Sequence, residues 1–488
     1  GAVIVVRLAN GTALTIDSRE VAPAAATADM FVDDPSLAEF GALASGVPGE
    51  LRGLHTAWET YGSGNVAWKD LFDEAIVAAE SMEVTELMVQ NLNDAGWEKI
   101  SASPGLAELY IKDDAFVEVG DVIKRPQLAA TLRSIANKGV DEFYTGAVAR
   151  NLISDLTDIG GIITLDDLAN YRVEIRDTVH AKYHGVELFG APPPFGSVVA
   201  MMAFNIVEGF ELATNDSQSM HYLAEAWKFA FDDRRLLGDP AFQPDNFTDI
   251  VDTMLSKEHA AELRRRIDPD SVLPLSNYTD LSPVGESVDD HGTMHLNTVD
   301  SEGNAVALTS TVNLLWGSKF VSPSTGIVLN NQMDDFSTPG FSNHFGVPPH
   351  ESNYIAPGKR PLSSMNPLIV TKGGRLTFLV GASGGTKIIT GPMQVLLNCL
   401  FFNYNVGEAV GLPRIHDQLL PQELKAEADV DERLLLKLEA RGHNVTRLDP
   451  GSWLANTAAI QVVFNEVENT HTLYGASDYR KNAAAAGY

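Results

Sequence analysis

The chain has 488 residues, of which 65 are Asp or Glu and 35 are Lys or Arg, so its formal net charge at pH 7 is -30. This acidity excludes a nucleic-acid-binding protein, which needs a basic face for phosphates, and a protein that docks on an anionic membrane surface. The single cysteine, Cys399, excludes an internal disulfide and a cysteine-based zinc site. The length favours about three domains.

The N-terminal segment GAVIVVRL has neither the charged start nor the cleavage site of a signal peptide, and it is typical of a β-strand. We therefore expect the natural start of the protein to lie upstream. Apolar runs such as 196–207 are shorter than the ~18 residues that a membrane span needs. N-x-S/T sequons, which also arise by chance, favour an extracytoplasmic protein (secreted, cell-surface, periplasmic or vacuolar) and a glycoprotein; they begin at Asn10, Asn215, Asn246, Asn277 and Asn444.

The first half of the chain is mainly helical by its apolar periodicity. Apolar residues recur at i, i+3 and i+4, which predicts amphipathic helices at 49–61, 67–81, 125–138, 141–157 and 217–235. Between about 268 and 292 the composition changes to Ser, Pro, Asp and Gly, which is typical of an exposed linker.

After Gly292 the pattern favours a sheet. Two β-rich runs, 293–299 and 305–312, flank a turn at 300–304 and predict a hairpin. The remaining sequence predicts strands at 368–371, 376–380, 460–464 and 472–474, and helices at 387–402 and 431–441. The fold class is therefore α/β or α+β.

The Gly-rich segment GASGGTK, residues 381–387, is predicted to join a strand to a helix. A nucleotide-binding P-loop is disfavoured, because that motif requires Gly where this chain has Thr386. The segment does satisfy G-x-S-x-G around Ser383, which would suit the nucleophile elbow of a serine α/β-hydrolase. Histidines that could complete such a site follow at His416, His443 and His471. A turn whose bare N–H groups face an anion is the alternative.

The segment DDHGTMH, residues 289–295, has two histidines four residues apart. His291 and His295 could bind a metal together only on a helix, whereas the residues that follow alternate like a strand. No metal and no cofactor is therefore predicted. Gly292 and Thr293 lie at the boundary between linker and strand, where a β-branched residue such as Thr is ordinary.

Several long motifs together resemble the γ-glutamyltransferase (γ-glutamyl transpeptidase) family. They occur in the family's order from near residue 1 to the end of the chain, which makes the resemblance specific. The motifs are SREVAPAAATADMF (18–31), GVPGELRGL (46–54), APPPFGS (191–197), FAFDDRRLLGDPAF (229–242), GTMHLNTVDSEGNAVALTSTVNLLWGSKFVSPSTGIVLNNQMDDFSTPG (292–340), KRPLSSMNP (359–367) and GASGGTK (381–387).

The resemblance implies an N-terminal-nucleophile hydrolase with a four-layer αββα sandwich. Such proteins are made as one chain that cuts itself, here between Gly292 and Thr293. The products would be a large subunit, 1–292, and a small subunit, 293–488, which together form one domain and a heterodimer. Relative to the family, we expect 1–292 to lack an upstream segment. After cleavage, Thr293 would combine a hydroxyl nucleophile with its own α-amine as base.

The resemblance also implies the residues that read a γ-glutamyl substrate such as glutathione. Arg19 would bind its α-carboxylate, together with the hydroxyls of Ser363 and Ser364. Gln332 and Asp335 would accept the α-ammonium. Taken alone, Arg19 would more ordinarily be interpreted as an arginine in a surface ion pair, and Asp335 as a helix-capping residue.

The remaining implied roles concern catalysis. Gly384 and Gly385 would hold the oxyanion through backbone N–H groups, and Thr311 and Asn313 would orient the nucleophile. The implied reaction forms a γ-glutamyl ester on Thr293 and transfers the acyl group to an amino acid, a dipeptide or water. A serine α/β-hydrolase that uses Ser383, and an inactive unprocessed homologue, remain the alternatives.

Overall fold

The computed structural model describes residues 1–214, 216–281, 292–465, 467, 470–481 and 483–487. The sequon at Asn215, the linker residues 282–291 and, with them, His291 lie outside the described residues. The other four sequon asparagines are exposed on the surface. Within the described ranges, no helix combines the length and the apolar character that crossing a membrane requires.

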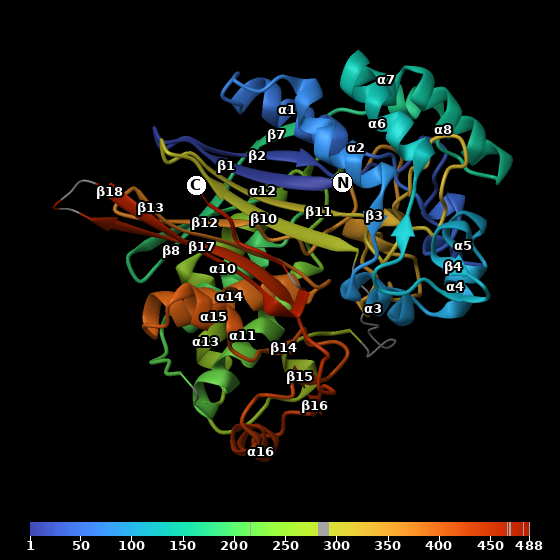
Figure 1. Ribbon diagram of the computed structural model, residues 1–488. Coiled ribbons are helices and arrows are strands. Elements are labelled where there is room, and N and C mark those ends of the chain that lie inside the picture. Colours follow the sequence, from blue (N-terminus) through green and yellow to red (C-terminus); the bar gives the residue numbers. More distant parts are fainter. Residues whose placement is uncertain (215, 282–291, 466, 468–469, 482, 488) are drawn as a thin grey trace.

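Two sheets lie face to face in the middle of the molecule (Figure 1). The first has the strand order β10-β11-β1-β2-β7, and its neighbouring strands are antiparallel. It combines strands from before and after residue 293, namely β1 (Ala2–Arg7), β2 (Ala13–Ser18), β7 (Glu174–Asp177), β10 (Thr293–Val299) and β11 (Ala305–Thr311).

The second sheet has the order β18-β17-β13-β12-β9-β8 and is also antiparallel. Its strands are β8 (Val179–Tyr183), β9 (Val186–Gly190), β12 (Leu368–Lys372), β13 (Arg375–Ser383), β17 (Asn456–Asn465) and β18 (Thr470–Ser477). Smaller sheets pair β3 (Met82–Glu83) with β6 (Val122–Ile123), β4 (Ile111–Lys112) with β5 (Ala115–Phe116), and β14 (Ile415–Asp417) with β15 (Leu424–Ala426) and β16 (Val445–Arg447).

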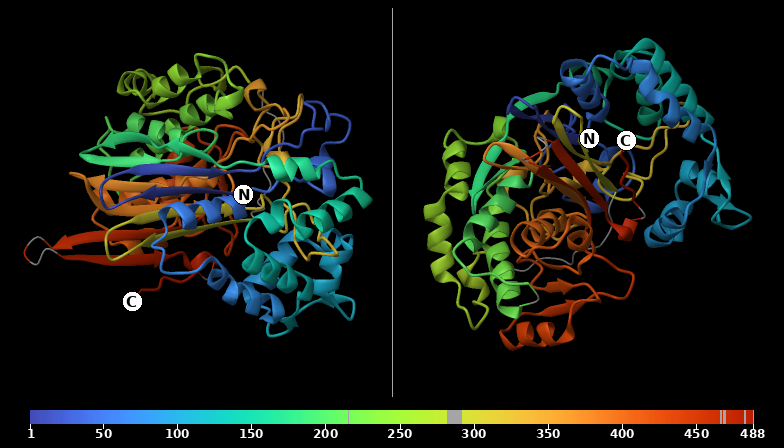
Figure 2. Two further views of the ribbon diagram at one scale, coloured as in Figure 1. Left: turned by 90° about the horizontal axis from the view of Figure 1, so that it is seen from above. Right: turned by 60° about the vertical axis from the view of Figure 1, so that its left-hand side comes forward.

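Helices cover the outer face of each sheet, as the two views of Figure 2 show. The segment before residue 293 contributes α1 (Glu50–Tyr61), α2 (Asp73–Glu80), α3 (Glu86–Ala95), α4 (Trp97–Ser101), α5 (Pro104–Tyr110), α6 (Pro126–Lys138), α7 (Asp141–Tyr144), α8 (Ala147–Asp158), α9 (Leu165–Asn170), α10 (Ser197–Val207), α11 (Ser217–Arg234), α12 (Phe247–Leu255) and α13 (Lys257–Arg266). The later segment contributes α14 (Lys387–Phe401), α15 (Val406–Gly411) and α16 (Glu432–Ala440).

Alternation along β1 explains the layering. Val3 and Val5 point into an apolar layer between the two sheets, whereas Ile4 and Val6 point to the other face, against α1. Successive residues of a strand face opposite sides, so a strand that is apolar throughout must be covered on both faces. A third apolar layer packs α10, α11 and α14 beneath the second sheet. The predicted α+β class and four-layer αββα sandwich are confirmed.

Most predicted elements are present with shifted ends. The helix predicted at 141–157 is wrong in one respect, because it is two helices, α7 and α8, separated at Thr145 and Gly146, where the backbone of Gly146 is extended. The predicted strand at 376–380 extends as β13 to Ser383, directly before the Gly-rich turn. In the first half only β1 was predicted as a strand, and the strands β2 to β9 were not.

Candidate active site

Thr293 is the first residue of β10 and lies opposite Thr311 on β11. Their hydroxyl oxygens are 2.9 Å apart. The Thr311 Oγ1 also accepts the backbone N–H of Asn313 at 2.8 Å, and its own O–H donates to the carbonyl oxygen of Gly292 at 3.1 Å. Because the hydroxyl hydrogen of Thr311 is donated to Gly292, the Thr311 oxygen accepts a hydrogen bond from the hydroxyl of Thr293. This contact is consistent with the predicted role of Thr311 in orienting Thr293.

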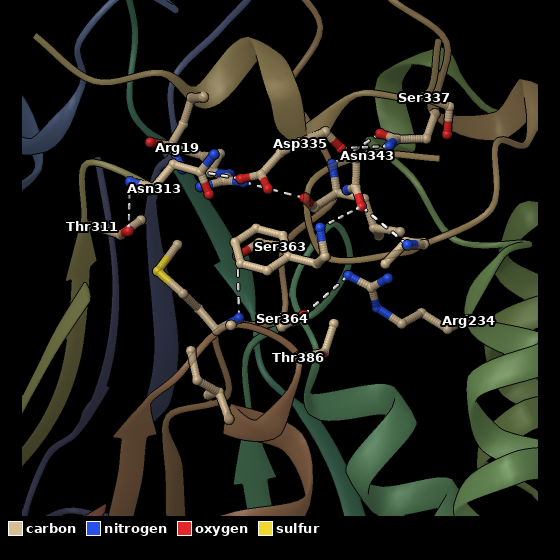
Figure 3. A pocket seen from close by; sticks show the side chains of 18 of the residues that line it. Arg19, Arg234, Thr311, Asn313, Asp335, Ser337, Asn343, Ser363, Ser364 and Thr386 are labelled. Atoms are coloured by element: carbon tan, nitrogen blue, oxygen red, sulfur yellow. Dashed lines mark hydrogen bonds and ion pairs between the residues drawn. The ribbon is translucent and has the colours of Figure 1, made fainter. Parts of the chain in front are cut away.

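Asn313 has φ +76, in the left-handed region that non-glycine residues rarely occupy. Its side-chain amide donates to the carbonyl of Asn331 at 3.1 Å, and it is buried. These contacts fix the turn after β11 and direct the Asn313 N–H at Thr311. In Figure 3 both side chains lie at the edge of one pocket.

The carbonyl of Gly292 accepts two hydrogen bonds, from the backbone N–H of Val312 at 3.0 Å and from the Thr311 hydroxyl. Two donors polarise a carbonyl in the manner of an oxyanion hole. Gly292 also packs closely, since a Cβ at this position would lie 2.1 Å from the carbonyl oxygen of Leu314. A close approach of backbone therefore requires glycine before Thr293.

Replacing Gly292 with Ala is expected to slow any self-cleavage by about 100-fold, because the clash must displace the polarised carbonyl from its donors. The measurement is the rate at which the full-length band converts to two fragments on a denaturing gel. Gly411→Ala is the matched control, because a Cβ there meets open space. Equal conversion rates in the two variants would contradict the expected effect.

Arg19 and Asp335 lie side by side in the pocket, with their charged groups in contact (Figure 3). The Arg19 Nη2 forms an ion pair with the Asp335 carboxylate and also donates to the carbonyl of Leu362 at 3.2 Å. The Gln332 Nε2 donates to the same carboxylate at 3.0 Å. The structure thus brings together the three residues that the sequence predicted for the two charged ends of a substrate, although Arg19 lies more than 300 positions from the other two.

One donor atom and one acceptor atom of these side chains form no hydrogen bond within the described part of the chain. The Arg19 Nη1 and the Gln332 Oε1 are buried and form no hydrogen bond among the described residues, although Nη1 lies 3.8 Å from the buried carboxylate of Glu20. A buried polar group without a partner costs about 1–3 kcal/mol, so such groups in a pocket indicate a ligand. A carboxylate would fit the free donor, and an ammonium the free acceptor.

Ser363 and Ser364 line the same pocket. The Ser363 Oγ accepts the N–H of Met365 at 3.1 Å, and the Ser364 Oγ accepts from Arg234 Nη2 at 3.2 Å. The 191–197 motif packs directly against this serine segment. The N–H of Ser363 donates to the carbonyl of Pro194 at 2.8 Å, and a Cβ on Gly196 would lie 2.7 Å from the carbonyl oxygen of Ser364. Both hydroxyls therefore have fixed positions.

Burial determines the electrostatics of this pocket. It raises the pKa of Asp335, against the opposing effect of the Arg19 guanidinium, and it lowers the pKa of Arg234 to about 10. Arg234 is therefore still charged at neutral pH. Desolvation, together with the carboxylates of Glu39 and Asp335, raises the pKa of the neighbouring Asp334 to about 7.

The Gly-rich turn joins β13 to α14, as the sequence predicts, with φ +135 at Gly384 and +59 at Gly385. Gly385 lines the pocket, while Gly384 lies against the carbonyl of Leu454, where a Cβ would be 2.8 Å from the oxygen. Ser383 is the last residue of β13, and its hydroxyl is 3.1 Å from the ammonium of Lys481.

The geometry does not favour an elbow nucleophile at Ser383. His416 is engaged through both ring nitrogens, with Thr390 at 2.8 Å and Gln418 at 3.1 Å. His443 Nε2 lies 2.8 Å from a nitrogen of His221, and His471 lies on β18 opposite Phe464. The described contacts of these three histidines are therefore with residues other than Ser383, and none of them is that of a general base bonded to the Ser383 hydroxyl.

Two histidine sites bear on metal binding. His295 is half-buried between β10 and β13, where it contacts Thr309 at 2.8 Å and Asn297 at 3.0 Å, and desolvation lowers its pKa to about 4. Elsewhere, ligand atoms of His221, Glu225 and His443 lie within 4.8 Å of one another. The two oxygens of Glu225 accept from Lys228 and Tyr278, and a lysine ammonium so close opposes a cation.

The pocket has a cavity volume of about 40 Å³. Of the predicted residues, those that line it are Arg19, Thr293, Thr311, Asn313, Gln332, Asp335, Ser363, Ser364 and Gly385. Sequence reasoning did not single out Arg234, Arg235 or Thr386, which also line the pocket. The two arginines lie in the FAFDDRRLLGDPAF motif, whose only local signal was a helix end.

A sequence profile described as Gamma-glutamyltranspeptidase matches residues 1–488. Glutathione hydrolase 2 of Arabidopsis thaliana is 39% identical, over all of this chain and 86% of that protein. The glutathione hydrolase proenzyme of Escherichia coli (strain K12) is 34% identical, over all of this chain and 84% of that protein.

Solved structures agree with the sequence comparisons. The crystal structure of cephalosporin acylase from Bacillus halodurans matches with a TM-score of 0.84 and 25% identity, over all of this chain and 87% of that chain. Helicobacter pylori gamma-glutamyltranspeptidase matches with a TM-score of 0.52 and 31% identity, over 57% of this chain and 81% of that chain.

Proposed function

Because this chain belongs to the γ-glutamyltranspeptidase family, we propose that it cleaves the γ-glutamyl bond of glutathione and related compounds through an ester on Thr293. The acyl group then passes to an amino acid, a dipeptide or water. The Arg19 Nη1 and the Gln332 Oε1 form no hydrogen bond among the described residues, and their side chains line the same pocket as Thr293; this is the observation that carries the proposal.

Maturation is the first step of the proposed course. The Thr293 hydroxyl attacks the carbonyl carbon of Gly292, whose oxygen is already polarised by Val312 and Thr311. The peptide bond becomes an ester, which water hydrolyses to separate a large subunit, 1–292, from a small subunit, 293–488. Cleavage exposes the α-amine of Thr293, which can act as a base because an α-amine has a pKa near ~7.7–8.0.

Donor binding follows from the paired charges of the pocket. The substrate α-carboxylate takes the free donor of Arg19 and the hydroxyls of Ser363 and Ser364. Its α-ammonium takes the Gln332 Oε1 and the carboxylate of Asp335. Each substrate charge thus meets an opposite charge, and each hydrogen bond to a charged group contributes about 1.5–3 kcal/mol.

Acyl transfer takes place at Thr293, which lines the same pocket. The α-amine takes the hydroxyl proton of Thr293 as the oxygen attacks the γ-carbonyl, and the N–H groups at Gly384 and Gly385 stabilise the oxyanion. The leaving amine takes the proton back, and the ester on Thr293 remains. For glutathione the leaving group is cysteinylglycine.

A trapping experiment tests the proposal. The purified protein is mixed with a γ-glutamyl anilide, quenched in acid within seconds, and digested for mass spectrometry. We expect a γ-glutamyl mass increment on the peptide that begins at Thr293. An increment on the peptide that contains Ser383 would support a serine hydrolase instead, and a single uncleaved chain without an increment would support an inactive homologue.

We also propose an extracytoplasmic location. The exposed sequons Asn10, Asn246, Asn277 and Asn444 support it, because glycosylation acceptors of secreted proteins lie on the surface. A glycosidase-induced shift of the band from the native source tests this point.

A further inference from the structure

Lys481 contacts the residue proposed as the nucleophile. It is the last residue of η8 (Tyr479–Lys481), which follows β18 near the end of the chain. Its Nζ donates to the carbonyl oxygen of Thr293 at 2.7 Å and to the Ser383 Oγ at 3.1 Å. Burial lowers the pKa of Lys481 to about 8, so that its ammonium still predominates at neutral pH.

The position of Lys481 relative to the Thr293 nitrogen follows from strand geometry. The N–H and the carbonyl of Gly292 both bond toward the β11 side, to the Asn313 oxygen and the Val312 N–H. Successive residues in a strand direct these groups to opposite edges. The nitrogen and carbonyl of Thr293 therefore both point away from β11, toward Lys481, at the open edge of the first sheet.

Standard bond lengths set an upper limit on the distance between the Lys481 Nζ and the backbone nitrogen of Thr293. The nitrogen and carbonyl oxygen of one residue are at most about 3.7 Å apart. With the 2.7 Å contact, the Lys481 Nζ lies no more than about 6.5 Å from the nitrogen of Thr293. Two ammonium groups this close repel each other strongly in a partly buried site, so one of them gives up its proton more readily.

We propose that the ammonium of Lys481 keeps the α-amine of Thr293 free of a proton after cleavage, so that the amine can act as the base at neutral pH. The proton stays on Lys481 because two acceptors, the Thr293 carbonyl and the Ser383 hydroxyl, hold that ammonium in place. Lys481 is thus a positioning residue that acts through the charge state of the amine. This inference rests on the proposed Thr293 mechanism.

Other charged groups near the amine must be separated from the effect of Lys481. On the pocket side these are Arg19, Arg234, Arg235 and Asp335. On the η8 side, Asp478 and Arg480 are paired with Arg414 and Glu427. On β10 itself, the half-buried His295 is the next titratable group. Because Lys481 alone among these cations is bonded to Thr293 in the described contacts, substituting it isolates its contribution.

The test is the pH dependence of kcat/KM for a γ-glutamyl anilide, measured on fully cleaved Lys481→Met and Lys481→Arg enzymes. The base must be unprotonated, so activity rises as pH passes the pKa of the amine. Removing the nearby positive charge raises that pKa. We expect the acid limb of Lys481→Met to move up by about one pH unit, with an approximately 10-fold loss at pH 6.5 and little loss at pH 9.

Lys481→Arg keeps the positive charge, so the acid limb of its kcat/KM profile should coincide with that of the wild type. Lys437→Met, at an exposed lysine of α16, is the matched control and should also leave the limb unchanged. An unshifted limb in Lys481→Met, or an equal loss at every pH, would overturn the proposal, because a purely structural role lowers activity without moving a pKa.

A second measurement is made on the wild-type protein, so it does not depend on whether a variant folds and cleaves itself. The rate of reductive methylation of the wild-type Thr293 amine is followed against pH by mass spectrometry of the fragment that begins at Thr293. A midpoint well below ~7.7 supports the proposal, and a midpoint at or above ~7.7 overturns it. This measurement does not depend on turnover, so a cleaved enzyme that hydrolyses no γ-glutamyl compound would refute the proposed function while leaving this test readable.

Discussion

Thr293→Ala is expected to give a single band of 52.7 kDa and to lose turnover of a γ-glutamyl anilide by at least about 10³-fold. One atom explains both losses, since the hydroxyl oxygen that attacks the Gly292 carbonyl is the one that later attacks substrate. The hydrogen bond between Thr293 and Thr311 would be lost as well. A denaturing gel and an initial-rate assay on the same sample measure the two effects.

Two controls make this result specific. Thr293→Ser keeps a hydroxyl and an α-amine, and should keep both cleavage and turnover. Ser383→Ala should still cleave and lose no more than about 10-fold in turnover, because it removes only one acceptor of Lys481. If Ser383→Ala were inactive and Thr293→Ala active, the assignment of the nucleophile would be wrong.

Arg19→Gln is expected to raise the KM for the donor by about 100-fold while leaving kcat within about 10-fold. The guanidinium supplies charge-assisted hydrogen bonds of about 1.5–3 kcal/mol to the substrate carboxylate. It should also lower the free energy of unfolding by about 3–5 kcal/mol, because Arg19 is fully buried and its loss leaves the carboxylate of Asp335 without its cation. Steady-state kinetics and denaturant unfolding measure the two effects.

The double variant Arg19→Gln/Asp335→Asn separates binding from folding. Removing both charges should recover much of the unfolding free energy, since no charge is left buried and unpaired. The KM should stay high, because neither charged end of the substrate then meets an opposite charge. A double variant with a normal KM would show that Arg19 acts only as a structural partner of Asp335.

Local pattern was enough to predict the strand that begins at Thr293 and much of the secondary structure. The alternation after Gly292 predicted a strand that begins at Thr293, and the turn residues at 300–304 predicted the hairpin that follows. These features depend on neighbours in the sequence. By contrast, β7 has the sequence EIRD and lies at the edge of its sheet, so it carries no apolar alternation that could reveal it.

The candidate site could be assembled from sequence only through the resemblance to a family. Arg19, read singly, looked like a surface ion pair, and its burial beside Asp335 depends on the packing of segments far apart in the chain. The structure also supplies a reason for Gly292 that the sequence did not. A Cβ at this position would clash with the carbonyl of Leu314, which lies far from Gly292 in the sequence, beyond the hairpin.

The sequence by itself determined the mixed helix and sheet class through its periodicity. Through the order of its motifs it also determined the family, and with the family the αββα sandwich and the residue proposed as the nucleophile. Only the tertiary structure decided which charges surround that nucleophile. Arg234 enters the pocket from the end of α11, and Lys481 reaches Thr293 from the end of the chain. Hydrogen bonds and charge interactions act through space, so no local spacing in the sequence could have placed either cation beside the site.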